Sequence, residues 1–232
     1  MQTISFYNLS FTLIPLIFVW YVYFKWTQDK KEIPSFIIRM VIQLLLIGFF
    51  LLYLFKNNNI LIGFTVLLFM AIVSSLITIR NTHNKSKEHY SQIFIAIMCS
   101  AFIHLFIIIF FVLEIYHFYD PRYVIPIAGM VFANTMNAIS ICVERFEQEI
   151  QRETFISARK IAFKASMIPQ INTLLAVGLV AIPGMMTGQI LSGVDPLIAV
   201  RYQIMIMAMV LSSAGMSVIV YFYLKQKFYK ER

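Results

Sequence analysis

Charged residues are scarce in this sequence. Only 13% of its 232 residues are Asp, Glu, Lys or Arg, against about 25% in an ordinary soluble domain. Apolar residues make up 60% of the chain instead, and the mean hydropathy is +0.78. This composition excludes a soluble globular domain, and the 16% of aromatic residues excludes a disordered chain. Because a membrane-spanning helix uses about 20 apolar residues, the composition limits the chain to about seven spans.

Several chemical signatures are also missing. The two cysteines, Cys99 and Cys142, lie inside apolar segments and cannot form a disulfide framework. The sequence contains no phosphate-binding G-x-x-x-x-G-K-[ST] loop, no H-E-x-x-H, no G-x-S-x-G and no pair of C-x-x-C motifs. These absences exclude ATP hydrolysis by the chain itself through a P-loop, and no nucleophile–base pair suggests an enzyme acting on lipid.

The apolar residues form seven long segments, which predict an all-α fold: a polytopic transmembrane helical bundle that occupies residues 1–232 as a single domain. The first basic residue, Lys25, follows the first segment, so we expect this segment to remain in the membrane and not to act as a cleaved signal peptide. The predicted spans are about 4–24, 35–55, 59–79, 92–114, 123–143, 168–192 and 198–223.

The distribution of basic residues predicts the orientation. Fifteen of the 19 lysines and arginines follow the first, third, fifth and seventh segments, whereas the opposite loops hold only Lys56 and Arg122. The positive-inside rule therefore places the N-terminus outside and the C-terminus in the cytoplasm of a cell membrane. These basic residues beside the membrane account for the net charge of +8, because they would interact with anionic lipid. The charge therefore does not require a nucleic-acid partner.

Polar side chains inside the predicted spans are informative, because each costs a few kcal/mol in lipid unless it is paired or faces water. Two interpretations stay open for them: hydrogen bonds that hold the helices together, each worth under about 1 kcal/mol, or a polar translocation pathway. For Arg39, Arg201 and Glu144, we favour a structural or gating ion-pair role over direct contact with a ligand. The candidate pathway residues are Arg39, Gln43, Asn134, Asn137, Asn172, Thr187, Gln189, Arg201 and Gln203.

The sixth predicted span contains a candidate hinge or dimer seam. Pro183 removes a backbone hydrogen bond and is expected to kink this helix. Gly184 and Gly188 follow at the four-residue spacing that lets two membrane helices approach closely. No compact set of metal ligands is evident, so the identity of any metal ligand stays unknown.

A longer stretch around this motif resembles a known family. The segment 182–204, which reads IPGMMTGQILSGVDPLIAVRYQI, is similar to the signature of FetB-type permeases, a family that includes plant aluminium-tolerance permeases. Three shorter matches are Arg39-x-x-x-Gln43 with Gly48, the segment 119–130, and Asn134-x-Met-Asn137 leading to Glu144-Arg145. The resemblance covers about 39–204.

The resemblance implies a permease subunit of an ABC transporter linked to iron export. It implies a separate ATPase subunit of the FetA type, which would bind ATP and Mg²⁺, whereas this chain binds no cofactor. A homodimer is expected, because ABC transporters need two membrane halves. The natural coupling element is the segment of about 144–167, which carries charges of both signs. The expected ATPase contacts are Glu144, Arg145, Phe146, Glu149 and Arg152.

Two alternatives to iron export remain. Plant relatives are linked to sugar-nucleotide transport, and Arg39 and Arg201 would pair well with phosphate in a permease for a sugar nucleotide or another small anion. The other alternative is a non-transporting membrane scaffold that recruits a cytoplasmic protein through 144–167.

Overall fold

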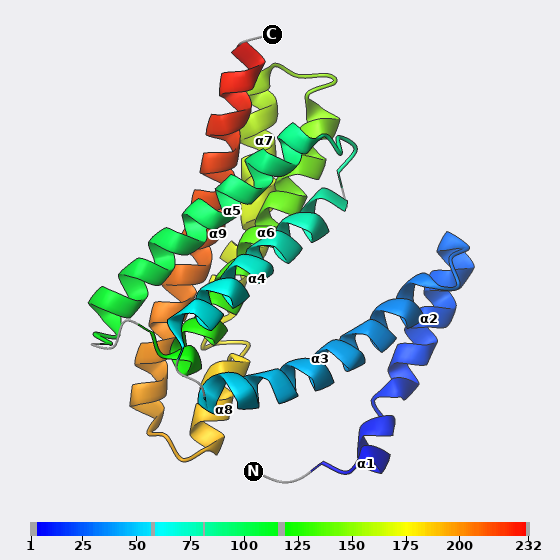
Figure 1. Ribbon diagram of the computed structural model, residues 1–232. Coiled ribbons are helices and arrows are strands. Elements are labelled where there is room, and N and C mark those ends of the chain that lie inside the picture. Colours follow the sequence, from blue (N-terminus) through cyan, green and yellow to red (C-terminus); the bar gives the residue numbers. More distant parts are fainter. Residues whose placement is uncertain (1–3, 57–58, 81, 116–118, 231–232) are drawn as a thin grey trace. The chain divides into compact units, whose positions relative to one another are not determined.

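The computed structural model describes residues 4–56, 59–80, 82–115 and 119–230 of the chain (Figure 1). Apart from one isolated β-bridge, every regular element in these described ranges is a helix, which confirms the predicted all-α fold. The helices fall into two compact units, residues 1–57 and residues 58–232. The expectation of a single domain over 1–232 stays a prediction, as does the orientation of the termini.

The first unit contains three helices, of which α2 and α3 are joined by a tight turn. Helix α1 is Phe6–Ser10, α2 is Leu13–Thr27 and α3 is Glu32–Lys56. The turn between α2 and α3 is stabilised locally, because Asp29 accepts backbone hydrogen bonds from Lys31 at 2.9 Å and Glu32 at 3.1 Å. The indole Nε1 of Trp20 donates to the carbonyl of Lys30 across the same turn. The large apolar side chains of α2 are mostly exposed, as expected for a helix that faces lipid.

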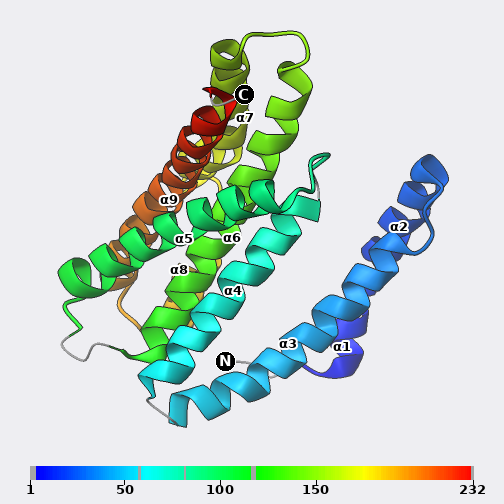
Figure 2. The same cartoon turned by 45° about the horizontal axis from the view of Figure 1, so that its top comes forward.

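The second unit is a bundle in which α6 occupies the centre and packs against α4, α5, α7 and α9 (Figures 1 and 2). Its elements are α4 Ile60–Arg80, α5 Lys87–Ile107 with the π-helical turn η1 Ile108–Val112, α6 Pro121–Glu149, α7 Phe155–Ala176, α8 Gly184–Leu191 and α9 Pro196–Lys230. Small and branched side chains fill the bundle core. The core includes Ile93, Ile97, Ala128, Val131, Ile139, Val143, Ala158, Ala162 and Val218.

Six described helical segments are long and apolar enough to cross a membrane, so the chain is a multi-pass membrane protein. They are Tyr7–Thr27, Glu32–Lys56, Ile60–Arg80, Lys87–Val112, Pro121–Glu149 and Pro196–Gln226. The predicted sixth span, 168–192, differs from this pattern, because it is not one helix. It consists of the second half of α7, a non-helical connection and the short helix α8.

The break has a local backbone cause. Gly178 adopts a φ of +79°, a left-handed conformation that favours glycine and ends the helical path after Ala176. Its N–H donates to the carbonyl of Ala181 at 3.0 Å, and the N–H of Val180 donates to Ala176, so the connection satisfies its own polar groups. Pro183 is therefore not the centre of a kinked helix, as the sequence suggested, but the residue that precedes α8. The prolines that do lie inside helices in this unit are Pro126 and Pro169.

Buried polar groups join α5 to α9. His104 Nε2 lies 2.9 Å from Ser212 Oγ, and Ser100 Oγ donates to the carbonyl of Ser213 at 2.8 Å. Nearer the other end of the same pair of helices, His89 Nε2 lies 3.1 Å from the hydroxyl of Tyr221. These contacts are interhelical hydrogen bonds of the kind that stabilise membrane bundles.

Candidate functional site

A cleft with mixed polar and apolar walls opens between α4, α6 and α7, with a volume of about 460 Å³. It brings two groups of polar side chains together from helices that are separate in the sequence. Helix α6 contributes the larger group and α7 the smaller. The lining residues are Ile77, Asn134, Met136, Asn137, Ser140, Ile141, Glu144, Pro169, Gln170 and Thr173.

Helix α6 places its polar residues on one face by simple periodicity. Asn134, Asn137 and Glu144 are three and seven residues apart, which keeps them on the same side of a helix with 3.6 residues per turn. The two asparagines lie near the middle of the 29-residue helix, and Asn137 is exposed. An exposed amide at the midpoint of a spanning helix is costly in lipid. This face of α6 is therefore suited to a hydrated path or to another polar surface.

Helix α7 supplies the opposite wall. Gln170 is buried and Thr173 is exposed in the cleft, one turn further along. Thr173 Oγ1 donates to the carbonyl of Pro169 at 2.8 Å. Asn172, which the sequence suggested for the pathway, is exposed but does not line this cleft.

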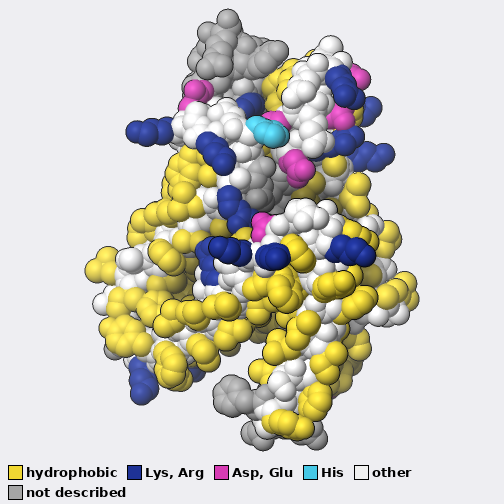
Figure 3. All heavy atoms as spheres, turned by 90° about the vertical axis from the view of Figure 1, so that its right-hand side faces the viewer, with side chains coloured by type: hydrophobic (Ala, Val, Ile, Leu, Met, Phe, Trp, Pro, Cys, Tyr) yellow, Lys and Arg dark blue, Asp and Glu magenta, His cyan; other side chains and the backbone are white. Residues whose placement is uncertain are grey.

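The end of the bundle where α6 meets α7 carries charges of both signs. Figure 3 shows acidic and basic side chains intermingled towards the top of the view. Arg145 and Glu149 form an ion pair with an N–O distance of 2.7 Å. Glu144 and Arg152 are exposed, and Arg152 lies in the turn that follows α6. The segment 144–167 continues α6 to Glu149, turns, and then forms the first part of α7.

Phe146 differs from the other residues that we expected to contact the ATPase. It is only 3% exposed, so it is a core residue and not a contact for a partner. Its ring packs edge-to-face against Phe155 of α7 and Phe222 of α9, with centroid distances of 5.4 and 5.2 Å. This aromatic cluster, Phe146, Phe155 and Phe222, joins three helices. It lies next to the end of α6 and the turn that follows it, residues 144–152, which we call the charged turn.

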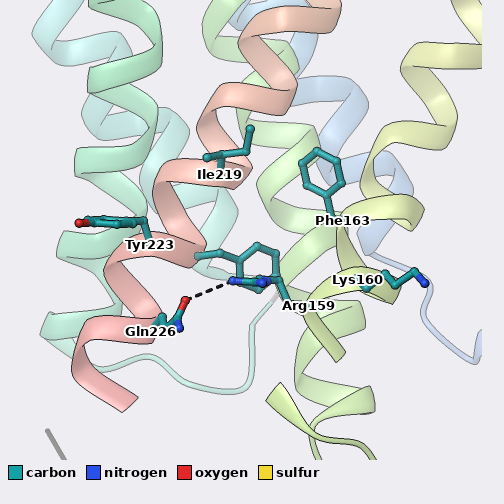
Figure 4. A pocket seen from close by; sticks show the side chains of 7 residues that line it. Arg159, Lys160, Phe163, Ile219, Tyr223 and Gln226 are labelled. Atoms are coloured by element: carbon teal, nitrogen blue, oxygen red, sulfur yellow. Dashed lines mark hydrogen bonds between the residues drawn. The ribbon is translucent and has the colours of Figure 1, made fainter. Parts of the chain in front are cut away.

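A narrow groove lies beside the aromatic cluster, between α7 and α9 (Figure 4). Arg159 reaches from α7 to α9 and donates from Nη1 to Gln226 Oε1 at 3.1 Å, as the dashed line in Figure 4 marks. Phe163 and Ile219 form the apolar part of the groove, and Lys160 points away from Gln226. Arg159 therefore ties the ends of the two helices together.

The remaining predicted residues lie elsewhere. Arg39 and Gln43 are exposed on α3, in the first unit. Thr187 and Arg201 are exposed on α8 and α9, and Gln189 is half-buried on α8. Gln203 is 4% exposed and lines a second pocket, an apolar one, beside the break between α7 and α8.

Some functional candidates were not singled out from the sequence. Gln170 and Thr173 are neighbours of Asn172 in the sequence, and the orientation of α7 decides that they line the cleft and that Asn172 does not. Glu147 is another such residue, because its carboxylate accepts backbone hydrogen bonds from His83 and Asn84. Glu147 is one of several charged residues in this segment, and nothing in the sequence distinguishes it as the residue that binds the loop. Within the described ranges, no group of three or more His, Cys, Asp and Glu side chains is placed to hold a metal ion.

Comparison with known proteins shows that residues 6–229 match the uncharacterised protein family UPF0014. The probable iron export permease protein FetB of Escherichia coli is 33% identical over 88% of this chain and 83% of its own length. A UPF0014 membrane protein of Synechocystis is 32% identical, over 78% of this chain and 76% of its own length. The protein ALUMINUM SENSITIVE 3 of Arabidopsis thaliana is 29% identical, over 80% of this chain and 72% of its own length. No solved structure matches.

Proposed function

Because this chain belongs to the UPF0014 family of membrane proteins, we propose that it is the membrane-spanning permease subunit of an ABC transporter. It exports iron or a related metal species and is driven by a separate ATPase subunit of the FetA type. The ATPase binds ATP and Mg²⁺, and this chain contributes no catalytic residue. The similarity to the probable iron export permease of Escherichia coli supports this assignment.

The observation that carries the proposal is the relationship between the polar cleft and the broken span. Both involve α7, whose residues Gln170 and Thr173 line the cleft and whose last residue, Ala176, begins the break. Discontinuous helices beside polar cavities are a recurring construction of transporters, because irregular backbone at membrane depth is tolerated where it is buried or lines a cavity. A bundle held only by packing has no need of such an arrangement.

The charged turn is the proposed docking surface for the ATPase. Glu144, Arg145, Glu149 and Arg152 present charges of both signs to a protein partner, which favours one orientation of docking over others. Phe146 supports this surface from beneath. A displacement of the turn reaches α7 and α9 through the aromatic cluster, and Glu144 belongs both to this surface and to the lining of the polar cleft.

We further propose that two copies of the chain form the transporter, with the Gly184 and Gly188 face of α8 as their seam. A Cβ atom built at either glycine meets no other atom within 4 Å. This face is therefore open for the close approach of a second helix.

A permease for a sugar nucleotide or another small anion is the second candidate. The exposed guanidinium groups of Arg39 and Arg201 favour it, because arginine pairs well with phosphate. A scaffold that recruits a cytoplasmic protein through 144–167 would use the same charged turn, but it gives no purpose to a polar cleft at the middle of α6.

The deciding experiment is ATP hydrolysis in proteoliposomes that contain this chain and an ABC ATPase subunit of the FetA type. We expect hydrolysis that iron stimulates and that is lost when this chain is omitted. Stimulation by a nucleotide sugar and not by iron would favour the second candidate. Failure of the chain to bind the ATPase would contradict the transporter and favour the scaffold.

A further inference from the structure

The narrow groove between α7 and α9 has a volume of about 360 Å³ and two chemically different ends (Figure 4). Arg159 and Lys160 of α7 lie at one end, together with Gln226 of α9. Phe163 and Ile219 lie at the other end. No Asp or Glu is among the described residues that line the groove. The groove therefore presents a cationic surface that continues directly into an apolar one.

The groove lies where α9 leaves its apolar run. The sequence from Tyr202 to Leu224 contains no charged residue, and Lys225 is the first one after it. Ile219 and Tyr223 are 54% and 77% exposed, although they belong to a segment long and apolar enough to span a membrane. Exposed side chains on such a segment face lipid, and tyrosine is enriched at the boundary between lipid and water. The apolar end of the groove is therefore suited to acyl chains and the cationic end to headgroups.

Arg159 is held in position at the cationic end. Its Nη1 donates to Gln226 Oε1 at 3.1 Å, and this is the only hydrogen bond of the guanidinium among the described residues. Because a guanidinium has five N–H donors, further donors remain for an acceptor in the groove. Neither Arg159 nor Lys160 forms an ion pair with an acidic side chain of the described ranges. A half-buried cation without a counter-ion favours the binding of an anion beside it.

We propose that this groove binds an anionic phospholipid of the surrounding membrane. The phosphodiester accepts hydrogen bonds from Arg159, Lys160 adds a second positive charge at the rim, and one acyl chain lies along Phe163 and Ile219. Basic pockets between membrane helices bind anionic headgroups in this way. The lipid is a bound structural ligand and not the transported substrate. Because Phe222 belongs both to the groove and to the aromatic cluster, the lipid stabilises the junction of α6, α7 and α9.

The two ends of the groove argue against other occupants. Free inorganic phosphate would use only the cationic end and would leave Phe163 and Ile219 without a partner. A zwitterionic phospholipid offers the same phosphate and the same acyl chains. Its headgroup, however, brings a further positive charge to an end that already holds Arg159 and Lys160, and like charges repel.

The test uses the full chain in detergent without any ATPase, so its outcome is independent of the proposed transport function. Native mass spectrometry counts bound molecules of dioleoyl phosphatidylglycerol, which is anionic, and of dioleoyl phosphatidylcholine, which is zwitterionic. We expect the first phosphatidylglycerol to bind at least tenfold more tightly than phosphatidylcholine. Equal binding of the two lipids would overturn the proposal. Phosphatidylglycerol should also raise the thermal midpoint of the chain, and an equal rise with inorganic phosphate alone would identify a phosphate site instead.

A pair of arginine variants separates a site from general attraction between the basic chain and anionic lipid. Arg159→Gln should weaken the binding of the first phosphatidylglycerol about tenfold. Arg152→Gln is the matched control, because it removes the same charge from an exposed position that does not line the groove, and it should leave this binding unchanged. Equal weakening by the two substitutions would contradict a site in the groove.

A pair of lysine variants keeps the test decisive if the loss of the Arg159–Gln226 hydrogen bond disturbs folding. Lys160 is exposed, so Lys160→Gln should leave the thermal midpoint in pure detergent unchanged while weakening phosphatidylglycerol binding about threefold. Lys85→Gln, at an exposed position in the loop before α5, is its control and should not alter the binding. Unchanged binding to Lys160→Gln would contradict the headgroup position.

Discussion

The carboxylate of Glu147 accepts a hydrogen bond from the backbone N–H of His83 at 2.9 Å, which fixes the loop between α4 and α5 to the end of α6. Its other oxygen accepts from the N–H of Asn84 at 3.3 Å. The loop and the charged turn are thereby held as one surface. The proposed ATPase would therefore contact the loop together with the turn.

Removal of this carboxylate should loosen the loop. We expect Glu147→Ala to increase backbone hydrogen exchange in 82–86 and to lower the free energy of unfolding by about 1–3 kcal/mol, because charge-assisted hydrogen bonds to two backbone donors are lost. Hydrogen-exchange mass spectrometry in nanodiscs measures both effects. Gln148→Ala, at the exposed neighbouring position, is the control and should leave the loop protected. Equal exchange in the two variants would contradict the role of Glu147.

The close packing of Tyr119 against Gly63 predicts how stability responds to an alanine at position 63. The ring of Tyr119 occupies the space that a Cβ atom at position 63 would need, whereas a Cβ at Gly129 would meet only Met70 Cε at 3.5 Å. Gly63→Ala should therefore lower the free energy of unfolding by about 1–3 kcal/mol. Gly129→Ala should be neutral or stabilising by up to about 1 kcal/mol, through its better helix propensity.

Thermal unfolding of the two variants in one detergent provides the comparison. Tyr119→Ala by itself should be destabilising because it removes a buried ring, but in that background Gly63→Ala should cost little, because the ring no longer occupies the contested space. An additive effect of the two substitutions would show that the ring and the glycine do not interact.

The polar cleft predicts which residues of α6 and α7 matter for transport. Asn137→Leu and Thr173→Val should reduce substrate-stimulated ATP hydrolysis at least tenfold, because both replace polar lining by apolar side chains without disturbing the core. Asn172→Leu should have little effect, since Asn172 does not line the cleft. Association with the ATPase should be unchanged in all three. The reverse ranking of Asn172 and Thr173 would contradict the cleft as the pathway.

The spans were predictable because apolar length alone defines them. The predicted span 59–79 corresponds to the helix Ile60–Arg80, and the predicted span 35–55 corresponds to the helix Glu32–Lys56. The break after Ala176 was not predictable in this way, since Leu179, Val180 and Ile182 keep the hydropathy high through a connection that is not helical. The signal was present in Gly178, but a glycine inside an apolar run is also common in intact membrane helices.

The site was predictable only in part, for similar reasons. The spacing of Asn134 and Asn137 places them on one face of any helix, so local periodicity was sufficient. The choice between Asn172 and Thr173 depends on how α7 is turned against α6, which is a property of packing. Phe146 lies among charges in the sequence, and its burial depends on Phe222, 76 positions away. Contacts at that separation leave no local pattern.

The ion pair of Arg145 and Glu149 allows charge recognition to be separated from helix stability. The single substitution Arg145→Glu should reduce ATPase binding about tenfold or more. The exchange of both, Arg145→Glu with Glu149→Arg, preserves an i,i+4 pair worth about 0.3–0.5 kcal/mol but reverses the charge pattern that a partner meets. We therefore expect the exchanged variant to fold normally and to bind the ATPase as poorly as the single variant. Restored binding would show that the pair serves only α6.

The open glycine face of α8 makes the last prediction. Gly184→Leu with Gly188→Leu should shift the chain from dimer to monomer, because leucine prevents two helix backbones from approaching closely. Leucine also has a higher helix propensity than glycine, so loss of the dimer would not follow from unfolding of α8. Gly48→Leu on α3 is the matched control, since a Cβ there also meets nothing within 4 Å; it should leave the dimer intact. Subunit counting by native mass spectrometry measures both variants, and a dimer that survives both leucines of α8 would place the seam elsewhere.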